Sequence, residues 1–189
     1  MIIGSVLENR EIEKRISITP EIAKKYISLG CEVMLPENYA NHLGIKDSDY
    51  REIGVKISKD ENDILNKADT IVQLGLMNDD KISLLKNNQT IIGILNPYTN
   101  EDKLKQLVKK NINVFSLELL PRITRAQSMD ILSSQANLAG YKAVLESFAY
   151  FGKAIPMMMT AAGTIPAAKV LVVGAGVAGL QAIATAKRM

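Results

Sequence analysis

The sequence is poor in the residues on which several functional classes depend. It has one cysteine, Cys31, and one histidine, His42, among 189 residues. A single cysteine excludes an internal disulfide and a multi-cysteine metal site, and it is typical of proteins from a reducing compartment. A single histidine excludes a histidine-rich metal centre. We therefore expect no metal site in this chain.

Aromatic side chains and charge of one sign are also scarce. Aromatic residues make up 5% of the chain, and tryptophan is absent. This composition argues against a stacking platform for single-stranded nucleic acid. Lysine and arginine total 23, aspartate and glutamate total 20, and the two signs are mixed along the chain. The net charge of +3 is too small to indicate a nucleic-acid partner.

Long hydrophobic runs are absent as well. The N-terminus lacks the charged start and apolar core of a secretion signal. The longest uncharged run spans residues 170–186, or 17 residues. As a helix it would measure ~25 Å, less than the ~30 Å of a bilayer's hydrocarbon core. The sequence therefore predicts no transmembrane segment.

What the sequence does contain is an alternation of short β-branched runs with segments of helical period. This pattern predicts an α/β fold, a parallel sheet covered by helices. Thr19, Pro20 and Glu21 predict the start of a helix that ends at Gly30. Strands are predicted at residues 2–6, 32–35, 55–58, 70–74, 90–95 and 113–117, and further helices at 62–67, 79–86 and 100–110.

The texture changes after Glu118, which predicts a second domain. We expect an N-terminal α/β domain over residues 1–127, a long inter-domain helix over 128–155 and a linker over 156–168. Residues 169–189 would begin the second domain. The linker contains Met157, Met158 and Met159, for which packing is the favoured interpretation because methionine fills irregular gaps.

A glycine fingerprint opens this second domain. Residues 169–173 are predicted to form a buried strand, followed directly by Gly174, Gly176 and Gly179 and then by a helical segment. In this context the first glycine allows a tight turn, the second lets the backbone approach a pyrophosphate, and the third lets the helix pack closely. The helix N-terminus would supply amides and partial positive charge. The alternative is a glycine-rich packing turn that binds nothing.

The fingerprint is incomplete within this chain. An acidic residue for the ribose hydroxyls is expected ~20 residues after the first glycine, which lies beyond Met189. The second domain would then have one strand and one helix, and a single βα unit cannot bury its apolar faces. We therefore expect the chain to be an N-terminal fragment of a longer protein.

A polar segment over residues 122–137 allows two interpretations. In one, Ser128 caps a helix and places Asp130 in its first turn, where the helix dipole favours a carboxylate. In the other, the segment faces a nicotinamide ring. No lysine or histidine occurs between Asn111 and Tyr141. Hydride transfer between two nicotinamides needs no base there, whereas dehydrogenation of an alcohol or amine does.

Three stretches carry a resemblance to a known family. Residues 125–141 (RAQSMDILSSQANLAGY), 156–164 (PMMMTAAGT) and 174–188 (GAGVAGLQAIATAKR) resemble the alpha subunit of proton-translocating NAD(P) transhydrogenases. The resemblance implies two Rossmann-like or flavodoxin-like domains, the second of them truncated, in the dimeric NAD(H)-binding component. That component passes hydride between NAD(H) and the NADP(H) of another component, while a membrane component moves protons.

The same resemblance implies a location and a set of site residues. The component would lie on the cytoplasmic side of the inner membrane, held there by its partners, and this fragment would be inactive alone. The residues matching the family's nicotinamide surroundings are Arg122, Gln127, Asp130 and Ser133. Those matching its pyrophosphate loop are Gly174, Ala175, Gly176, Val177, Ala178 and Gly179.

Two further hypotheses come from the same residues. Alanine dehydrogenase shares the early Arg-x-x-x-Thr-Pro stretch, here Arg15 to Pro20, but it also uses a lysine and a histidine. The corresponding segments here, residues 71–76 and 94–97, contain neither. Arg15 and His42 are then interpreted as structural or solvated. A third hypothesis, compatible with the transhydrogenase, is a non-catalytic folding or dimerisation fragment.

Overall fold

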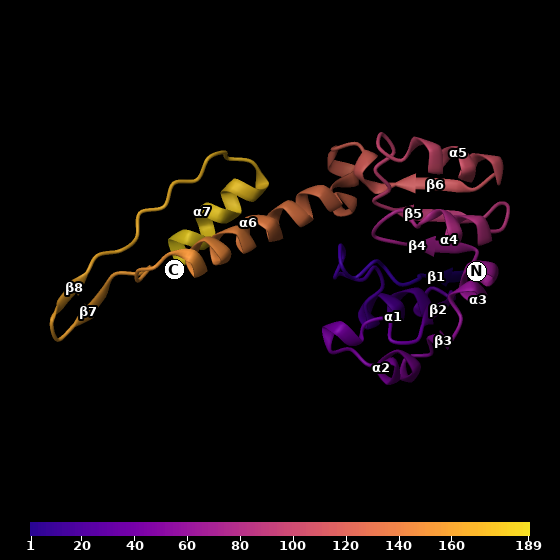
Figure 1. Cartoon of the computed structure of the whole chain (residues 1–189), viewed down its shortest axis with the longest axis horizontal. Coiled ribbons are helices and arrows are strands. Elements are labelled where there is room, and N and C mark those ends of the chain that lie inside the picture. The colour runs from indigo at the N-terminus through magenta and orange to yellow at the C-terminus, as the bar shows by residue number, and fades with distance from the viewer. The chain divides into compact units, whose positions relative to one another are not determined.

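The computed structural model describes residues 1–189 and divides into two units (Figure 1). The first unit is Met1–Leu120, and the second is Pro121–Met189. No helix in either unit is both long enough and apolar enough to span a bilayer.

The first unit contains a six-stranded sheet in which all neighbouring strands are parallel. The strand order is β3-β2-β1-β4-β5-β6, the doubly wound order of the Rossmann fold. The predicted α/β class and parallel sheet are therefore confirmed, although most strands are shorter than expected. Their bounds are β1 Ile2–Gly4, β2 Glu32–Pro36, β3 Lys56–Ser58, β4 Thr70–Val72, β5 Thr90–Gly93 and β6 Asn113–Ser116.

Helices connect these strands, and the first begins where the sequence predicts it. The Thr19 hydroxyl accepts a hydrogen bond from the Ile22 N–H at 3.4 Å, which caps α1. Helix α2 was not predicted, because its six residues are too short to show a helical period. The elements are α1 Pro20–Ser28, η1 Asn41–Leu43, α2 Asp47–Glu52, α3 Glu61–Lys67, α4 Asp79–Leu84, α5 Glu101–Lys109 and η2 Leu117–Leu119.

The sheet has a hydrophobic cluster on each face. Along β2, Val33 and Leu35 join one cluster and Met34 joins the other, because successive strand side chains point to opposite faces. One cluster receives Ala23 from α1 and Tyr50 from α2, and the other receives side chains from α3, α4 and α5. Both clusters contain fully buried residues, so this unit has a core of its own.

The second unit is built on two helices. Helix α6 spans Ile131–Tyr150 and packs against α7, Val177–Arg188. A 3₁₀ helix, η3 Thr124–Met129, precedes α6. The expected helix start at Ser128 is therefore wrong, because Ser128 belongs to the 3₁₀ helix and α6 begins three residues later.

The predicted buried strand at residues 169–173 is not formed in this chain. No sheet pairing includes these residues, and the exposed fractions of Leu171 and Val173 are 87% and 92%. A strand needs a neighbouring strand for its backbone hydrogen bonds and a covering layer for its side chains. Residues 121–189 offer this segment neither.

The expected linker contains an antiparallel hairpin instead of an unstructured crossing. Strand β7, Met158–Thr160, pairs with β8, Gly163–Ile165. The exposed fractions of Met157, Met158 and Met159 are 63%, 42% and 83%. The packing predicted for these methionines is therefore not present within the chain.

Candidate functional site

The polar segment of the second unit is organised by Asp130, which caps α6. Its Oδ1 accepts a hydrogen bond from the Ser133 backbone N–H at 2.9 Å. Its Oδ2 accepts the Ser133 hydroxyl proton at 2.6 Å. The expectation that Asp130 lies in the first helical turn is therefore corrected: Asp130 is itself the N-cap. Aspartate is among the strongest N-cap residues because its oxygen satisfies an otherwise unpaired amide.

The charge of Asp130 is stabilised by the same contacts. The hydrogen bonds from the Ser133 hydroxyl and backbone N–H lower the pKa of the Asp130 carboxyl below its ordinary value, and the positive charge of Arg122 adds to this effect. Arg122 and Gln127 are exposed, whereas Asp130 and Ser133 are half-buried. The structure thus joins Asp130 to Ser133 directly and to Arg122 through its charge, and it leaves the Gln127 side chain at the surface.

The glycine loop before α7 has the geometry that its sequence predicts. Gly174 has a φ of +106°, a left-handed conformation that side chains strongly disfavour. Gly176 is the N-cap of α7, and a Cβ built there has no atom within 4 Å. The loop therefore turns sharply at its first glycine and leaves open space beside its second.

The third glycine closes the loop on itself. A Cβ at Gly179 would lie 2.1 Å from the carbonyl oxygen of Gly174. Only glycine therefore permits this approach between the first turn of α7 and the start of the loop. The contact is made with backbone, which cannot move aside as the end of a flexible side chain could.

A fourth glycine, Gly140, fixes the crossing of α6 and α7. A Cβ there would lie 2.1 Å from the carbonyl oxygen of Ala178, in the first turn of α7. The Asn137 side chain also donates a hydrogen bond to Gln181 Oε1 at 3.3 Å. The helix that begins at Asp130 is thereby fastened to the helix that begins at the glycine loop. Sequence reasoning missed this role, although a glycine within a long helix is itself a signal of close packing.

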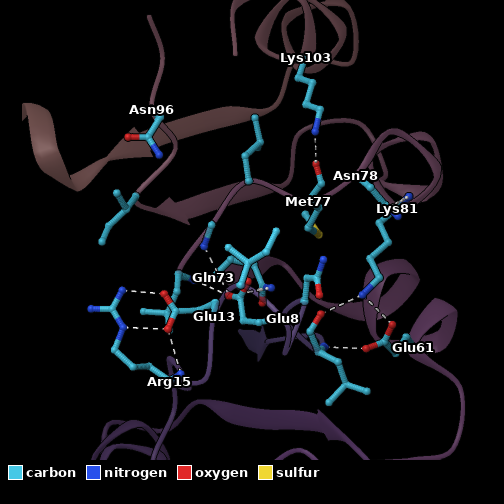
Figure 2. Close-up of a pocket in the computed structure, with 17 residues that line it drawn as sticks. Glu8, Glu13, Arg15, Glu61, Gln73, Met77, Asn78, Lys81, Asn96 and Lys103 are labelled. Atoms are coloured by element: carbon cyan, nitrogen blue, oxygen red, sulfur yellow. Dashed lines mark hydrogen bonds and ion pairs between the residues drawn. The ribbon is translucent and has the colours of Figure 1, made fainter. Parts of the chain in front are cut away.

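The first unit has a pocket of about 810 Å³ at the carboxyl ends of β1, β4 and β5 (Figure 2). Strand order reverses between β1 and β4, and ligands of doubly wound folds bind at such a switch point. Glu8, which sequence reasoning did not single out, lines this pocket. Burial raises the pKa of the Glu8 carboxyl above its ordinary value, although hydrogen bonds from the backbone of Leu74 and Gly75 oppose the shift.

Arg15 lines the same pocket and is held by Glu13. The guanidinium donates to Glu13 Oε1 at 2.8 Å and to Oε2 at 2.6 Å. The counterparts of the alanine dehydrogenase lysine and histidine are Gly75 and Asn96, and both line the pocket. His42 lies outside it, is exposed, and shares a hydrogen bond with the Lys14 carbonyl at 2.7 Å.

The parallel sheet and the glycine turn before α7 define an α/β protein of the Rossmann type. The sequence matches the family descriptions "Alanine dehydrogenase/PNT, N-terminal domain" over residues 4–139 and "Alanine dehydrogenase/PNT, C-terminal domain" over residues 143–189. The chain belongs to this alanine dehydrogenase/PNT family.

Similar proteins narrow the relationship within the family. The first part of the NAD(P) transhydrogenase alpha subunit of Rickettsia prowazekii is 45% identical over 193 residues, covering 100% of this chain and 50% of that protein. The crystal structure of transhydrogenase from Sinorhizobium meliloti matches with a TM-score of 0.94 and 42% identity, covering 100% of this chain and 56% of that one. The resemblance to transhydrogenase alpha subunits is thus confirmed. The chain spans about half the length of the curated relatives it matches.

Alanine dehydrogenases are more distant. Alanine dehydrogenase 1 of Staphylococcus aureus is 23% identical over 154 residues, covering 82% of this chain and 40% of that protein. A solved L-alanine dehydrogenase is 19% identical with a TM-score of 0.85, covering 100% of this chain and 52% of that one. This second likeness shows a shared fold only.

Proposed function

We propose that the chain supplies the NAD(H)-binding part of a proton-translocating NAD(P) transhydrogenase, in which hydride passes between NAD(H) here and NADP(H) on a partner component. The observation that carries the proposal is the fastening of two helix starts within the second unit. Gly140 holds α6 against the first turn of α7. The capped polar segment and the glycine loop therefore belong to one arrangement, as a site for a dinucleotide requires.

The glycine loop fits a pyrophosphate. The open space beside Gly176 allows a phosphate to approach the backbone, and the sharp turn at Gly174 leads the chain into α7. The N-terminus of α7 offers unpaired amides and partial positive charge, which stabilise an anion. When bound, the nicotinamide of NAD(H) would supply the hydride chemistry.

The polar segment fits an amide-bearing ring. Because the Ser133 hydroxyl donates its proton to Asp130, its oxygen has lone pairs left to accept a hydrogen bond from a carboxamide NH₂. Gln127 is exposed and can both donate and accept. Arg122 balances the charge of Asp130. No group in this segment is a base, which agrees with a transfer of hydride that removes no proton.

We also propose three partners, namely a second copy of the chain, an NADP(H)-binding component and a membrane-spanning component that moves protons. The subunit names of the relatives support partner components. The exposed apolar side chains of the β7–β8 hairpin support a dimer, since water-exposed methionines gain from burial in an interface. The assembly would hold this chain on the cytoplasmic side of the inner membrane.

The alanine dehydrogenase alternative has no observation in its favour. Arg15 is bound by Glu13, and Gly75 and Asn96 stand where that enzyme has its lysine and histidine. We therefore expect no alanine-dependent NADH formation. The 189 residues alone should bind NADH weakly, because α7 and its loop lack the sheet that supports them in a Rossmann domain. A micromolar dissociation constant for NADH would contradict this expectation.

The test of the proposed site is Asp130→Asn in the full-length, reconstituted enzyme. Asparagine caps a helix about as well as aspartate, so folding should be unchanged while the charge is lost. We expect single-turnover transhydrogenation to fall at least about tenfold, because small misplacement of reacting groups is costly. Arg122→Gln should behave alike. Wild-type rates in both variants, with unchanged melting temperatures, would remove the nicotinamide assignment and leave Asp130 as a cap alone.

A further inference from the structure

The pocket of the first unit is a feature that hydride transfer does not use. At about 810 Å³ it is within the usual size range of small-molecule sites. Every residue that lines it belongs to the first unit. Its floor is the sheet edge at β1, β4 and β5, so its shape rests on strands and not on a loop alone (Figure 2). We call this cavity the Glu8 pocket.

Glu8 is held firmly on one side of its carboxylate. Its Oε1 accepts hydrogen bonds from the Leu74 N–H at 2.6 Å and from the Gln73 side-chain amide at 3.1 Å. The orientation of Gln73 is fixed in turn, because its Oε1 accepts from the Ser5 hydroxyl at 2.8 Å and from the Val6 N–H at 3.0 Å. Glu8 is therefore a pre-positioned acceptor in a partly buried place.

The other carboxylates of the pocket already have cations. Glu13 pairs with Arg15 at 2.6 Å, and Glu61 pairs with Lys81 at 2.8 Å. Glu8 has no ion pair, and its amide partners carry no net charge. A partly buried carboxylate without a counter-charge is stabilised by a cation that enters beside it.

Gly75 leaves room for that cation. A Cβ built on Gly75 would meet only Glu8 Oε2, at 3.7 Å, an ordinary van der Waals distance. The oxygen of Glu8 that makes no backbone contact therefore faces space that a side chain at position 75 would otherwise occupy. The pocket thus presents an uncompensated carboxylate oxygen next to an opening.

We propose that the Glu8 pocket binds a small organic ammonium ion that carries no carboxylate, with the ammonium on Glu8 Oε2. The single anionic oxygen suits a monovalent ammonium, since no group of three or more metal-ligating side chains converges in the structure. The apolar stem of such a ligand would contact Ile12, Leu76 and Ile94, which also line the cavity. A carboxylate ligand is disfavoured, because Arg15 is engaged by Glu13 and Glu8 would repel it.

The probe is n-propylammonium chloride, titrated at pH 7 into the 189-residue chain and followed by amide NMR shifts. Sodium propionate, n-propanol and L-alanine at equal ionic strength are the matched comparisons. A four-atom ligand of high efficiency reaches a dissociation constant of about 1 mM. We expect propylammonium to shift the amides of Leu74 and Gly75 with such a constant, and the other three to bind at least tenfold more weakly. Equal binding of propionate or L-alanine would overturn the proposal.

Variants locate the charge. Glu8→Gln keeps an acceptor for the backbone but loses the charge, and it should weaken propylammonium binding at least tenfold. Glu11→Gln makes the same charge change at an exposed position outside the pocket and should leave binding unchanged. Undiminished binding in Glu8→Gln would remove Glu8 from the site and overturn the proposal.

A second variant does not depend on the folding of Glu8→Gln. Gly75→Lys places a tethered ammonium in the space beside Glu8, and Gly75→Met adds an uncharged side chain there. We expect the lysine variant to melt at a higher temperature than the methionine variant at pH 7 and to bind no propylammonium. A lysine variant no more stable than the methionine variant would show that the pocket does not favour a cation.

Discussion

The two units of this chain differ in what supports their candidate sites. The first unit buries a hydrophobic cluster on each face of its sheet, and its pocket rests on that sheet. The second unit buries few apolar side chains, chiefly Ala126, Val144 and Ala182. Leu180 and Leu171 are 58% and 87% exposed. The residues proposed to bind the dinucleotide thus lie in the unit with little core of its own.

This difference teaches that local geometry and stability have separate origins here. The glycine loop and the Asp130 cap are held by backbone contacts between neighbouring segments, such as Gly179 against Gly174. They need no large core to form. The sheet of the first unit requires long-range burial, because parallel strands pair only with strands distant in sequence.

The largest effect should come from the core of the first unit. Ile71→Ala removes a fully buried side chain of β4 and should lower the free energy of unfolding by about 2–5 kcal/mol. Leu180→Ala, on exposed α7, should change it by about 0.5 kcal/mol or less. Urea unfolding can be followed by near-ultraviolet circular dichroism, to which the edge-on pair Tyr39 and Tyr50 contributes. Equal effects of the two variants would refute the difference between the units.

The next effect concerns the glycine loop of the full-length protein. Gly179→Ala places a Cβ against the Gly174 carbonyl and should weaken NADH binding at least about 100-fold, since the loop must move. Gly152→Ala makes the same change where no atom lies within 4 Å and serves as the control. Fluorescence titration of NADH measures both. Wild-type affinity in Gly179→Ala would mean that the loop does not hold the nucleotide.

A smaller effect distinguishes the two residues considered as the cap of α6. Asp130→Ala leaves the Ser133 N–H without its acceptor and should lower the melting temperature of the second unit by about 2–4 °C. Ser128→Ala should have no such effect, because Ser128 lies before the cap within η3. Thermal circular dichroism compares them. A larger loss for Ser128→Ala would restore the cap predicted from the sequence.

The smallest effect is the pH dependence contributed by Glu8. Because burial raises the folded-state pKa of this carboxyl, its contribution to stability falls as pH rises from about 4.5 through the raised pKa. Glu8→Gln should therefore raise the melting temperature of the first unit at pH 7, by no more than about 2 °C, and change it little at pH 4. Glu11→Gln is the control. A decrease at pH 7 that is absent at pH 4 would contradict the assigned direction.

Several of these features could be predicted from the sequence because they depend on residues close in the chain. The Thr19 cap and the glycine turn at Gly174 are of this kind, since side chain or backbone conformation decides them locally. The alternation of apolar runs predicted the parallel sheet. The resemblance from Arg125 onward predicted the family.

Features that depend on contacts between distant segments could not be predicted. Glu8 acquires its role from Gln73 and Leu74, more than sixty residues away, and no local pattern marks it. The missing strand at residues 169–173 has the composition of a strand but no neighbour in the structure. The cap at Asp130 was displaced from Ser128 because a 3₁₀ helix, whose sequence pattern resembles an α-helix, occupies residues 124–129.

The central claim is that this chain takes part in hydride transfer between two nicotinamide nucleotides, and isotope transfer tests it most directly. The full-length protein is assembled with its NADP(H)-binding and membrane components and given NADP⁺ with NADH deuterated at the transferable position of the nicotinamide. The account predicts that the NADPH formed carries the deuterium, with one NAD⁺ released for each NADPH. NADPH without the label, or NADH formation driven by alanine at a typical enzymatic rate of ~10 per second, would contradict it.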